Sequence, residues 1–260
     1  MAARELLERF ADELLNAELT RKPIDPLTDR AQLTINDAYT IQKIIINKKL
    51  EKGAKIIGRK IGLTNKAMQR ALNVYEPDYG HLLDTMLIYE SEPIHLNELI
   101  QPRVEVEIAF IFNDDVRDNP SPSNIMRKVE GVVPAIEVID SRIKDWKIKI
   151  QDTIADNASS ARFIMGEPIT KISGLDLRTV GVVVRKNGEI VQTGVGANVL
   201  GDPMVSVTWL AKKLLEFGDY IKAGDIVLSG SLIAPIDIRA GDVIEAEFGC
   251  GLGTVHAYVL

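Results

Sequence analysis

The chain has 260 residues, of which 46% are hydrophobic and 26% are charged, a balance typical of a globular protein with one large or two small domains. Its formal net charge of −6 leaves no basic stripe for phosphate contacts, so we expect no nucleic-acid partner. No apolar run approaches the roughly 18 residues that a membrane-spanning helix needs, so we expect no membrane partner either.

The cellular location is predicted from the N-terminus and the cysteine count. The first residues are amphipathic and acidic, unlike a signal or transit peptide. The single Cys250 cannot form an internal disulfide, which fits a reducing compartment, and we expect it to be buried in a glycine-rich strand end. These features predict a cytoplasmic protein.

Helices are predicted first along the chain. Leu6, Phe10 and Leu14 recur at helical spacing. After a proline-containing linker, Thr34-Ile-Asn-Asp37 resembles a capping box that begins a helix reaching about residue 50. We therefore predict a helical segment over residues 1–54.

Short strands separated by turns are predicted from residue 55 onward, which makes 55–260 a β-rich domain. Asn187-Gly188 lies between two strand-like runs and is a strong hairpin signal. Helices followed by many strands indicate an α+β fold. The predicted strands are 55–61, 103–112, 132–139, 180–185, 189–193, 226–229 and 242–248, and the later helices are 65–72 and 204–217.

The clearest chemical signal is a set of three glutamates in predicted strands. Glu105 and Glu107 share one face of the first strand, about 7 Å apart, while apolar residues fill the other face. Glu137 lies in a second, otherwise apolar strand. A buried carboxylate without a partner is strongly unfavourable or loses its charge. A divalent cation, which prefers oxygen ligands, would compensate all three.

Two simpler interpretations of these glutamates stay open. Glutamates two positions apart on a strand usually mark a solvated face, although Ala109 and Ile111 share that face here. Glu137 could be satisfied by an ion pair with Arg103 or Arg142.

Two further residues are candidates for proton transfer. Lys60 lies between Gly58 and Gly62, which allow close backbone approach, and a lysine there could bind an anionic substrate or act as an acid or base. Asp78 lies in Pro-Asp-Tyr-Gly, which favours a tight turn, and a loop carboxylate beside a pocket could carry a proton.

Two polar stretches could line a binding site. The cluster Asp156, Asn157, Ser159 and Ser160 indicates either a helix N-terminus or a polar pocket wall. Ser229-Gly-Ser231 after an apolar strand indicates an anion cradle or only a turn. We find no zinc spacing, dinucleotide fingerprint, P-loop or G-x-S-x-G motif.

Several motifs together resemble the 2-hydroxypenta-2,4-dienoate (2-oxopent-4-enoate) hydratases of the fumarylacetoacetate hydrolase superfamily, over nearly the whole chain. They are Lys60-Ile-Gly-Leu-Thr64, Pro77-Asp-Tyr-Gly-His-Leu-Leu83, Pro102-Arg-Val-Glu-Val-Glu-Ile-Ala-Phe110, Ile136-Glu-Val-Ile-Asp-Ser-Arg-Ile143, Asp145-Trp-Lys-Ile148, Asp152-Thr-Ile-Ala-Asp-Asn-Ala-Ser159, Gly224-Asp-Ile-Val-Leu-Ser-Gly-Ser231 and Gly251-Leu-Gly-Thr-Val255.

The resemblance implies a fold and a set of site residues. The fold is a β-roll around a partly closed mixed β-barrel, with the N-terminal helices packed outside. The family's Mg²⁺ or Mn²⁺ ligands fall on Glu105, Glu107 and Glu137, and its active-site lysine falls on Lys60. Asp78 is the second catalytic candidate, and the residues expected to bind the substrate are Thr64, Ser160 and Ser229.

The resemblance also implies an activity. We expect a metal-dependent hydratase that adds water to 2-hydroxypenta-2,4-dienoate and gives 4-hydroxy-2-oxopentanoate, in the meta-cleavage catabolism of aromatic compounds. A 4-oxalocrotonate decarboxylase is the alternative, because it uses the same metal ligands, and a non-catalytic partner subunit of a hydratase–decarboxylase complex is the second alternative. The expected partners are a small 2-oxo or 2-hydroxydienoic acid, further copies of the chain and a decarboxylase or hydratase of the pathway.

Overall fold

The computed structural model describes residues 3–71 and 74–260. The helices are α1 (Arg4–Thr20), α2 (Ile35–Glu51), α3 (Lys66–Ala71), α4 (Pro122–Lys128), α5 (Ile150–Ala155) and α6 (Pro203–Glu216). The strands are β1 (Ile56–Gly62), β2 (Asp78–Leu83), β3 (Leu87–Ile88), β4 (Arg103–Phe112), β5 (Val129–Ile139), β6 (Ser160–Met165), β7 (Gly181–Lys186), β8 (Glu189–Val195), β9 (Ile226–Ser231), β10 (Ile236–Asp237), β11 (Val243–Phe248) and β12 (Gly253–Tyr258).

The two N-terminal helices form as predicted and pack on the strands. The capping box is present, because the Asp37 amide donates to the Thr34 hydroxyl at 3.1 Å and the Thr34 amide donates to the Asp37 carboxylate at 3.0 Å. Phe10 of α1 is fully buried in the same apolar cluster as Val138 of β5. The helices therefore share a core with the strands, and the division into 1–54 and 55–260 stays a prediction.

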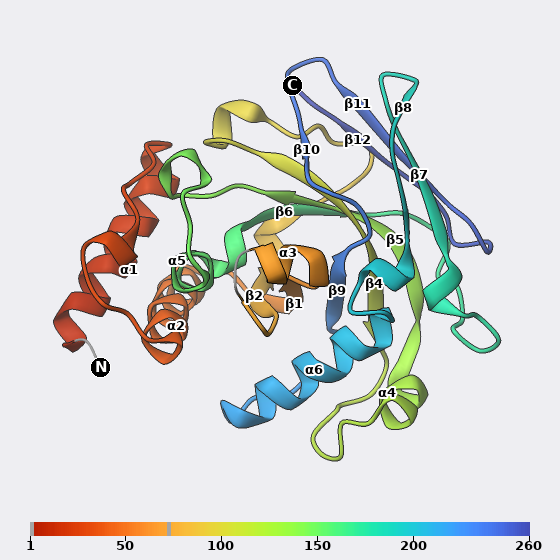
Figure 1. Cartoon of the computed structure of the whole chain (residues 1–260), viewed down its shortest axis with the longest axis horizontal. Coiled ribbons are helices and arrows are strands. Elements are labelled where there is room, and N and C mark those ends of the chain that lie inside the picture. Colours follow the sequence, from red (N-terminus) through yellow and green to blue (C-terminus); the bar gives the residue numbers. More distant parts are fainter. Residues whose placement is uncertain (1–2, 72–73) are drawn as a thin grey trace.

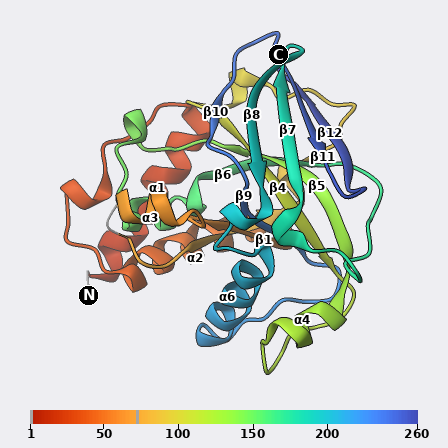
Figure 2. The same cartoon turned by 45° about the vertical axis from the view of Figure 1, so that its right-hand side comes forward.

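The strands form two sheets, which confirms the α+β class and the partly closed barrel. The larger sheet has the order β2-β1-β9-β4-β5-β6-β3, and β10 pairs with β4. It is mixed, because β1–β9 and β3–β6 are parallel while the other pairs are antiparallel. The smaller sheet has the order β12-β11-β7-β8. Figures 1 and 2 show the larger sheet curled into a half-barrel, with α1, α2 and α5 on one side and the smaller sheet on the other.

Most predicted elements lie within a few residues of the observed ones. The strand predicted over 103–112 has the bounds of β4, and the strand predicted from residue 132 begins earlier, at Val129. The Asn187-Gly188 hairpin joins β7 to β8, with φ values of 55° and 85° at these two residues. The predicted helix 65–72 corresponds to α3, and its last residue lies outside the described part of the chain.

Three local expectations were wrong. Asp78 does not lie in a turn but begins β2, because pairing with β1 overrides the turn preference of the Pro-Asp-x-Gly sequence. The cluster from Asp156 to Ser160 does not begin an α-helix; it follows the C-terminal end of α5 and leads into β6, whereas the alternative of a polar pocket wall holds for Ser160, which lines a groove. Cys250 is exposed, because it lies in the turn between β11 and β12 rather than in a strand.

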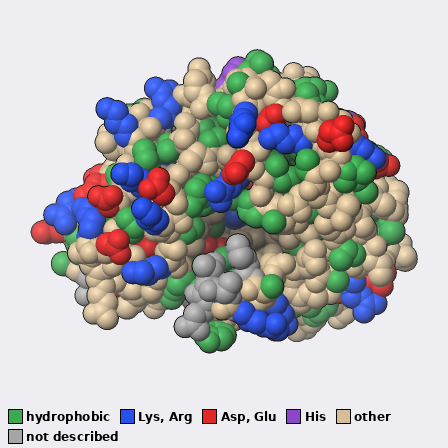
Figure 3. Space-filling model, turned by 45° about the horizontal axis from the view of Figure 1, so that its top comes forward, with side chains coloured by type: hydrophobic (Ala, Val, Ile, Leu, Met, Phe, Trp, Pro, Cys, Tyr) green, Lys and Arg blue, Asp and Glu red, His purple; other side chains and the backbone are tan. Residues whose placement is uncertain are grey.

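The surface shows no concentration of basic charge on the face drawn in Figure 3. Lys and Arg side chains are mixed there with Asp and Glu side chains and with apolar ones. Among the described residues, no helix combines the length and the apolar character needed to cross a membrane.

Candidate active site

The structure brings the three predicted glutamates together on one face of the larger sheet. Glu105 of β4 lies directly opposite Glu137 of β5 in the antiparallel register, and Glu107 is two positions further along the same face of β4. A carboxylate oxygen from each residue lies within 4.8 Å of the others. The strand alternation that suggested a shared face therefore also places the side chains close enough to hold one cation.

These carboxylates have few partners. Glu107 and Glu137 are fully buried, and three of their four oxygens make no hydrogen bond. The exception is Oε2 of Glu107, which accepts the Gly230 amide at 2.6 Å. Glu137 Oε2 is within ion-pair distance of a lysine, described below, but without hydrogen-bond geometry. Burial raises the pKa of Glu105 to about 7 and that of Glu107 well above its usual value.

This donor set fits a divalent cation. Buried carboxylate oxygens without partners are unfavourable unless a positive charge compensates them. Three carboxylates in mutual reach supply the hard oxygen ligands that Mg²⁺ and Mn²⁺ prefer. The ligand role of these residues stays a prediction. The two simpler interpretations are weakened, because Glu107 and Glu137 are buried and neither proposed arginine pairs with Glu137. Arg103 pairs with Asp237, and Arg142 pairs with Asp156.

The partner of Glu137 is Lys60, in the centre of β1. Its Nζ lies 3.1 Å from Glu137 Oε2 and donates to the Ala158 carbonyl at 3.0 Å. The side chain is buried, at 2% exposure. Burial alone would lower the pKa of Lys60, but the surrounding carboxylates, with Glu137 the strongest, raise it above the usual value. Lys60 is therefore a charged ammonium group held beside the three carboxylates.

Asp78 faces the same site from the first position of β2. It pairs with Gly62 of β1, two residues from Lys60, and both of its carboxylate oxygens are buried without a hydrogen bond. Burial raises the pKa of Asp78 to about 6, although Lys60 acts in the opposite direction. Gly62 leaves the room that this carboxylate occupies, because a Cβ there would overlap Asp78 Oδ1. A carboxyl group with such a pKa can both donate and accept a proton near neutral pH.

A cavity of about 380 Å³ opens beside Glu105. Among its described lining residues Glu105 is the only charged one, and most of the others are apolar. Thr64 lines this cavity and packs against Gly230, where a Cβ would overlap the Thr64 side chain. The described lining residues are Ile61, Gly62, Leu63, Thr64, Asn65, Ala67, Glu105, Ser231, Ile233, Ala234 and Pro235.

Neither of the two predicted substrate-binding serines lines the cavity beside Glu105. Ser229 of β9 is fully buried, its hydroxyl has no partner, and its carbonyl accepts the Ser206 hydroxyl at 2.7 Å. Ser160 is also buried with a free hydroxyl, but it lines a separate groove of about 910 Å³ beside α1 and α2. Neither serine is among the described residues that line the cavity at Glu105. Their roles in substrate binding stay predictions.

Sequence reasoning missed the backbone groups of the site. The Gly230 amide, in the segment predicted to be an anion cradle or only a turn, donates to Glu107. The Ala158 carbonyl, which accepts from Lys60, has no side chain that could have signalled it. The apolar wall formed by Ile233 and Pro235 was also missed, because the loop after β9 approaches Glu105 only in the folded chain.

Comparison with known proteins identifies relatives over the whole chain. The fumarylacetoacetate (FAA) hydrolase C-terminal family matches residues 57–260. A 2-keto-4-pentenoate hydratase of Paraburkholderia xenovorans is 41% identical over 96% of this chain and 93% of its own length. A 4-oxalocrotonate decarboxylase of Pseudomonas putida is 40% identical over 98% of this chain and 97% of its own length.

One solved structure is also similar over the full length of the chain. The 4-oxalocrotonate decarboxylase from Pseudomonas putida G7, complexed with magnesium and adipate, superposes with a TM-score of 0.96 and 37% identity, covering 100% of this chain and 99% of that one. The family match and these relatives confirm the resemblance seen in the sequence motifs. The chain belongs to the fumarylacetoacetate hydrolase family.

Proposed function

We propose that this chain is a divalent-metal-dependent hydratase that adds water to 2-hydroxypenta-2,4-dienoate and gives 4-hydroxy-2-oxopentanoate in aromatic meta-cleavage catabolism. The observation that carries the proposal is the convergence of three poorly partnered carboxylates with a buried lysine and a fourth buried carboxylate, that of Asp78, next to an apolar cavity that Glu105 lines. The relatives named as hydratases support the substrate class.

Glu105, Glu107 and Glu137 would hold one Mg²⁺ or Mn²⁺. When bound, the cation supplies Lewis-acid stabilisation of the negative charge that develops on a 2-oxo acid. The neighbouring decarboxylase structure contains magnesium, which supports this choice of cation.

Lys60 and Asp78 supply the proton transfers in this proposal. The dienol loses its 2-hydroxyl proton and gains one at C5, which gives a conjugated 2-oxo-3-enoate; water then adds with its hydroxyl at C4 and its proton at C3. Asp78 can accept and return a proton, because burial raises its pKa to about 6. Lys60 is the second candidate for these transfers, and its charge also stabilises the enolate oxygen. Thr64, Ser160 and Ser229 are the candidates for holding the polar end of the substrate.

The cavity favours the hydratase over the decarboxylase. Its described lining offers apolar side chains such as Ile233 and Pro235, and Glu105 is its only charged group. The second carboxylate of 4-oxalocrotonate would have no cation there, whereas the uncharged tail of the pentadienoate would contact apolar surface. The decarboxylase stays the second candidate, because a decarboxylase structure superposes with a TM-score of 0.96.

An assay of the purified protein with both substrates tests the proposal. With Mg²⁺ or Mn²⁺, we expect 2-hydroxypenta-2,4-dienoate to be converted to 4-hydroxy-2-oxopentanoate and 4-oxalocrotonate to release little carbon dioxide. The opposite preference would identify a decarboxylase. Inactivity on both substrates with either metal would indicate the non-catalytic partner subunit instead.

We also propose that the chain works as a homo-oligomer in the cytoplasm and associates with a decarboxylase or hydratase of its pathway. The edge strand β8 supports self-association, because Ile190 and Val191 are 62% and 44% exposed on it. Light scattering at micromolar concentration tests the oligomer. A mass near the 28.7 kDa of one chain would contradict it.

A further inference from the structure

The turn that follows α5 has an unfavourable backbone conformation. Asn157, Ala158 and Ser159 have φ values of 55°, 50° and 54°. The left-handed region is disfavoured for residues that carry a Cβ, and Ala158 has no polar side chain to compensate. Three such residues in succession persist only where the surrounding structure fixes them, and conformations of this kind cluster at functional sites.

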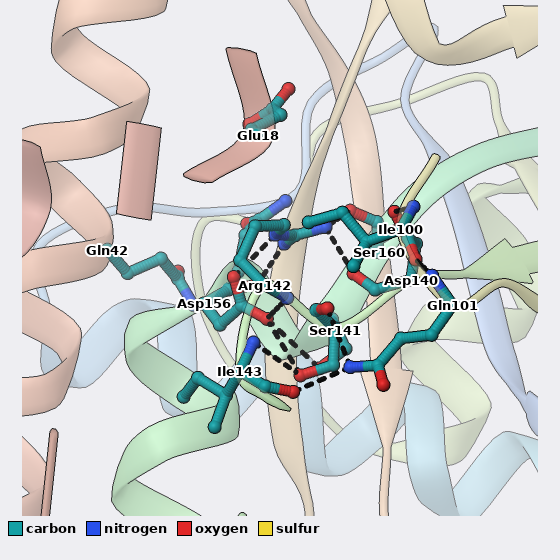
Figure 4. Close-up of polar contacts among 12 residues, drawn as sticks. Glu18, Gln42, Ile100, Gln101, Asp140, Ser141, Arg142, Ile143, Asp156 and Ser160 are labelled. Carbon is teal, nitrogen blue, oxygen red and sulfur yellow. Dashed lines mark hydrogen bonds and ion pairs between the residues drawn. The ribbon is translucent and has the colours of Figure 1, made fainter. Parts of the chain in front are cut away.

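A buried ion pair fixes this turn from one side (Figure 4). Arg142 Nε donates to Asp156 Oδ1 at 2.5 Å, and the Arg142 amide donates to Asp156 Oδ2 at 3.0 Å. The same guanidinium donates to the carbonyls of Asp156 and Ser160, one on each side of the turn. Arg142 therefore holds both ends of the left-handed segment, and both charged side chains are buried.

Strand β2 fixes the turn from the other side. The His81 amide donates to Asn157 Oδ1 at 2.7 Å, and Asn157 Nδ2 donates to the His81 carbonyl at 3.0 Å. Gly80 has no room for a Cβ, which would overlap the Asn157 carbonyl. The turn is thus held between β2 and the segment after β5.

The group that this turn presents to the site is the Ala158 carbonyl. It accepts from Lys60 Nζ at 3.0 Å, and the same nitrogen lies 3.1 Å from Glu137 Oε2. A cation bound by Glu137 would repel the Lys60 ammonium, so the ammonium needs a second, neutral acceptor to stay at the site.

We propose that the strained turn Asn157–Ser159, held by Arg142 and Asp156, is a positioning device whose Ala158 carbonyl keeps the Lys60 ammonium beside the metal-binding carboxylates. This inference rests on the proposed function for the role of Lys60. Ala158, Arg142 and Asp156 act through Lys60 and do not themselves contact the reacting atoms.

The Ala158→Gly variant tests the device, because glycine adopts positive φ without strain but lets the carbonyl reorient. We expect a melting temperature about 2 °C or more above that of the parent in chelator. We also expect a Mn²⁺ dissociation constant, measured by isothermal titration calorimetry, about 5-fold higher, because Lys60 then competes with the cation for Glu137. We expect kcat on the dienoate about 10-fold lower, with KM nearly unchanged.

Cys250→Gly is the matched control. Cys250 has a φ of 58°, is exposed, and lies in the turn between β11 and β12, away from Lys60. This variant should also raise the melting temperature, but it should leave Mn²⁺ affinity and kcat at the parental values.

The results separate this inference from the proposed function. An Ala158→Gly variant that binds Mn²⁺ and turns over like the parent overturns the inference and leaves the function intact. A variant that melts below the parent and keeps the parental Mn²⁺ affinity also overturns it. If the parent has no activity on the dienoate, the proposed function fails, and the Mn²⁺ titration with the melting temperatures still decides whether the turn positions Lys60.

Discussion

Two buried charged clusters lie next to each other in this protein and differ in one respect. Around Arg142 the charged groups have partners: Asp156 accepts from Arg142, and the Asp140 carboxylate accepts the amides of Ile100 and Gln101 at 2.9 and 2.7 Å. Among the described residues there, the Ser160 hydroxyl is the one buried group without a partner. Around Glu137, most carboxylate oxygens have no hydrogen bond. The charged groups of the first cluster are paired within the chain, and the second leaves buried carboxylate oxygens that a divalent cation could bind. Unsatisfied groups, rather than charge or burial alone, therefore mark the candidate active site.

The difference between the two clusters predicts that a substitution among the glutamates around Glu137 removes activity and preserves the fold. Glu107→Gln removes one of the three predicted carboxylate ligands, while its side-chain oxygen can still accept the Gly230 amide. We expect metal-dependent turnover to fall about 1,000-fold, because charge stabilisation at the reacting centre is lost. The melting temperature in chelator should stay the same or rise, because a poorly partnered buried charge is removed. Full activity of the variant in chelator-treated buffer would contradict the ligand role of Glu107.

A change in the Arg142 cluster should instead destabilise the fold. Asp156→Asn leaves the Arg142 guanidinium buried with only neutral acceptors. Breaking a buried ion pair from one side typically destabilises a protein by about 3 kcal/mol or more. Urea unfolding of the metal-free protein should show this loss. A variant as stable as the parent would mean that the Arg142 cluster does not stabilise the fold.

Lys60 connects the two clusters, and its replacement should affect turnover more than binding. In Lys60→Ala the charge beside Glu137 and the donor to the Ala158 carbonyl are both lost. We expect kcat to fall about 100-fold with a much smaller change in KM, because the ammonium acts on charge that develops during the reaction. If steady-state kinetics show that only KM changes, Lys60 binds the substrate carboxylate and does not take part in proton transfer.

The pH dependence of metal stabilisation is the smallest expected effect. Burial raises the pKa of Glu105 from 4.5 to about 7, so its ionised form is disfavoured in the folded metal-free chain. Its contribution to stability is therefore fully present below pH 4.5 and is lost as the pH rises through about 7. Mg²⁺ binds ionised carboxylates, so its stabilising effect should increase with pH. With Mg²⁺ at about 100 times its dissociation constant, we expect it to raise the melting temperature by about 5 °C at pH ~8 and by far less at pH ~5.

Differential scanning calorimetry with and without Mg²⁺ measures this effect. Glu105→Gln is the control, since it should lose most of the difference between the two pH values. Equal Mg²⁺ stabilisation at both pH values would contradict the raised pKa of Glu105.

The sequence allowed the three clustered glutamates to be predicted, but not the groups that contact them. The alternation around Glu105 and Glu107 depends on local strand geometry alone, so it can be recognised without the fold. The partner of Glu137 could not be recognised, because Lys60 reaches it from a distant strand, while Arg103 and Arg142 looked closer in sequence. The Ala158 carbonyl was invisible for another reason, because any residue at that position supplies a carbonyl.

The position of β9 in the sheet determines when the candidate active site can assemble during folding. Lys60 and Asp78 belong to the β1–β2 pair, and the glutamates belong to the β4–β5 pair. These two hairpins are joined in the sheet only through β9, whose Gly230 follows Glu107 by 123 positions. During synthesis, both hairpins leave the ribosome well before the strand that brings them together. The nascent chain therefore carries its acidic residues without the complete predicted metal site until nearly all of it has been made, and we expect tight Mn²⁺ binding only once β9 has inserted.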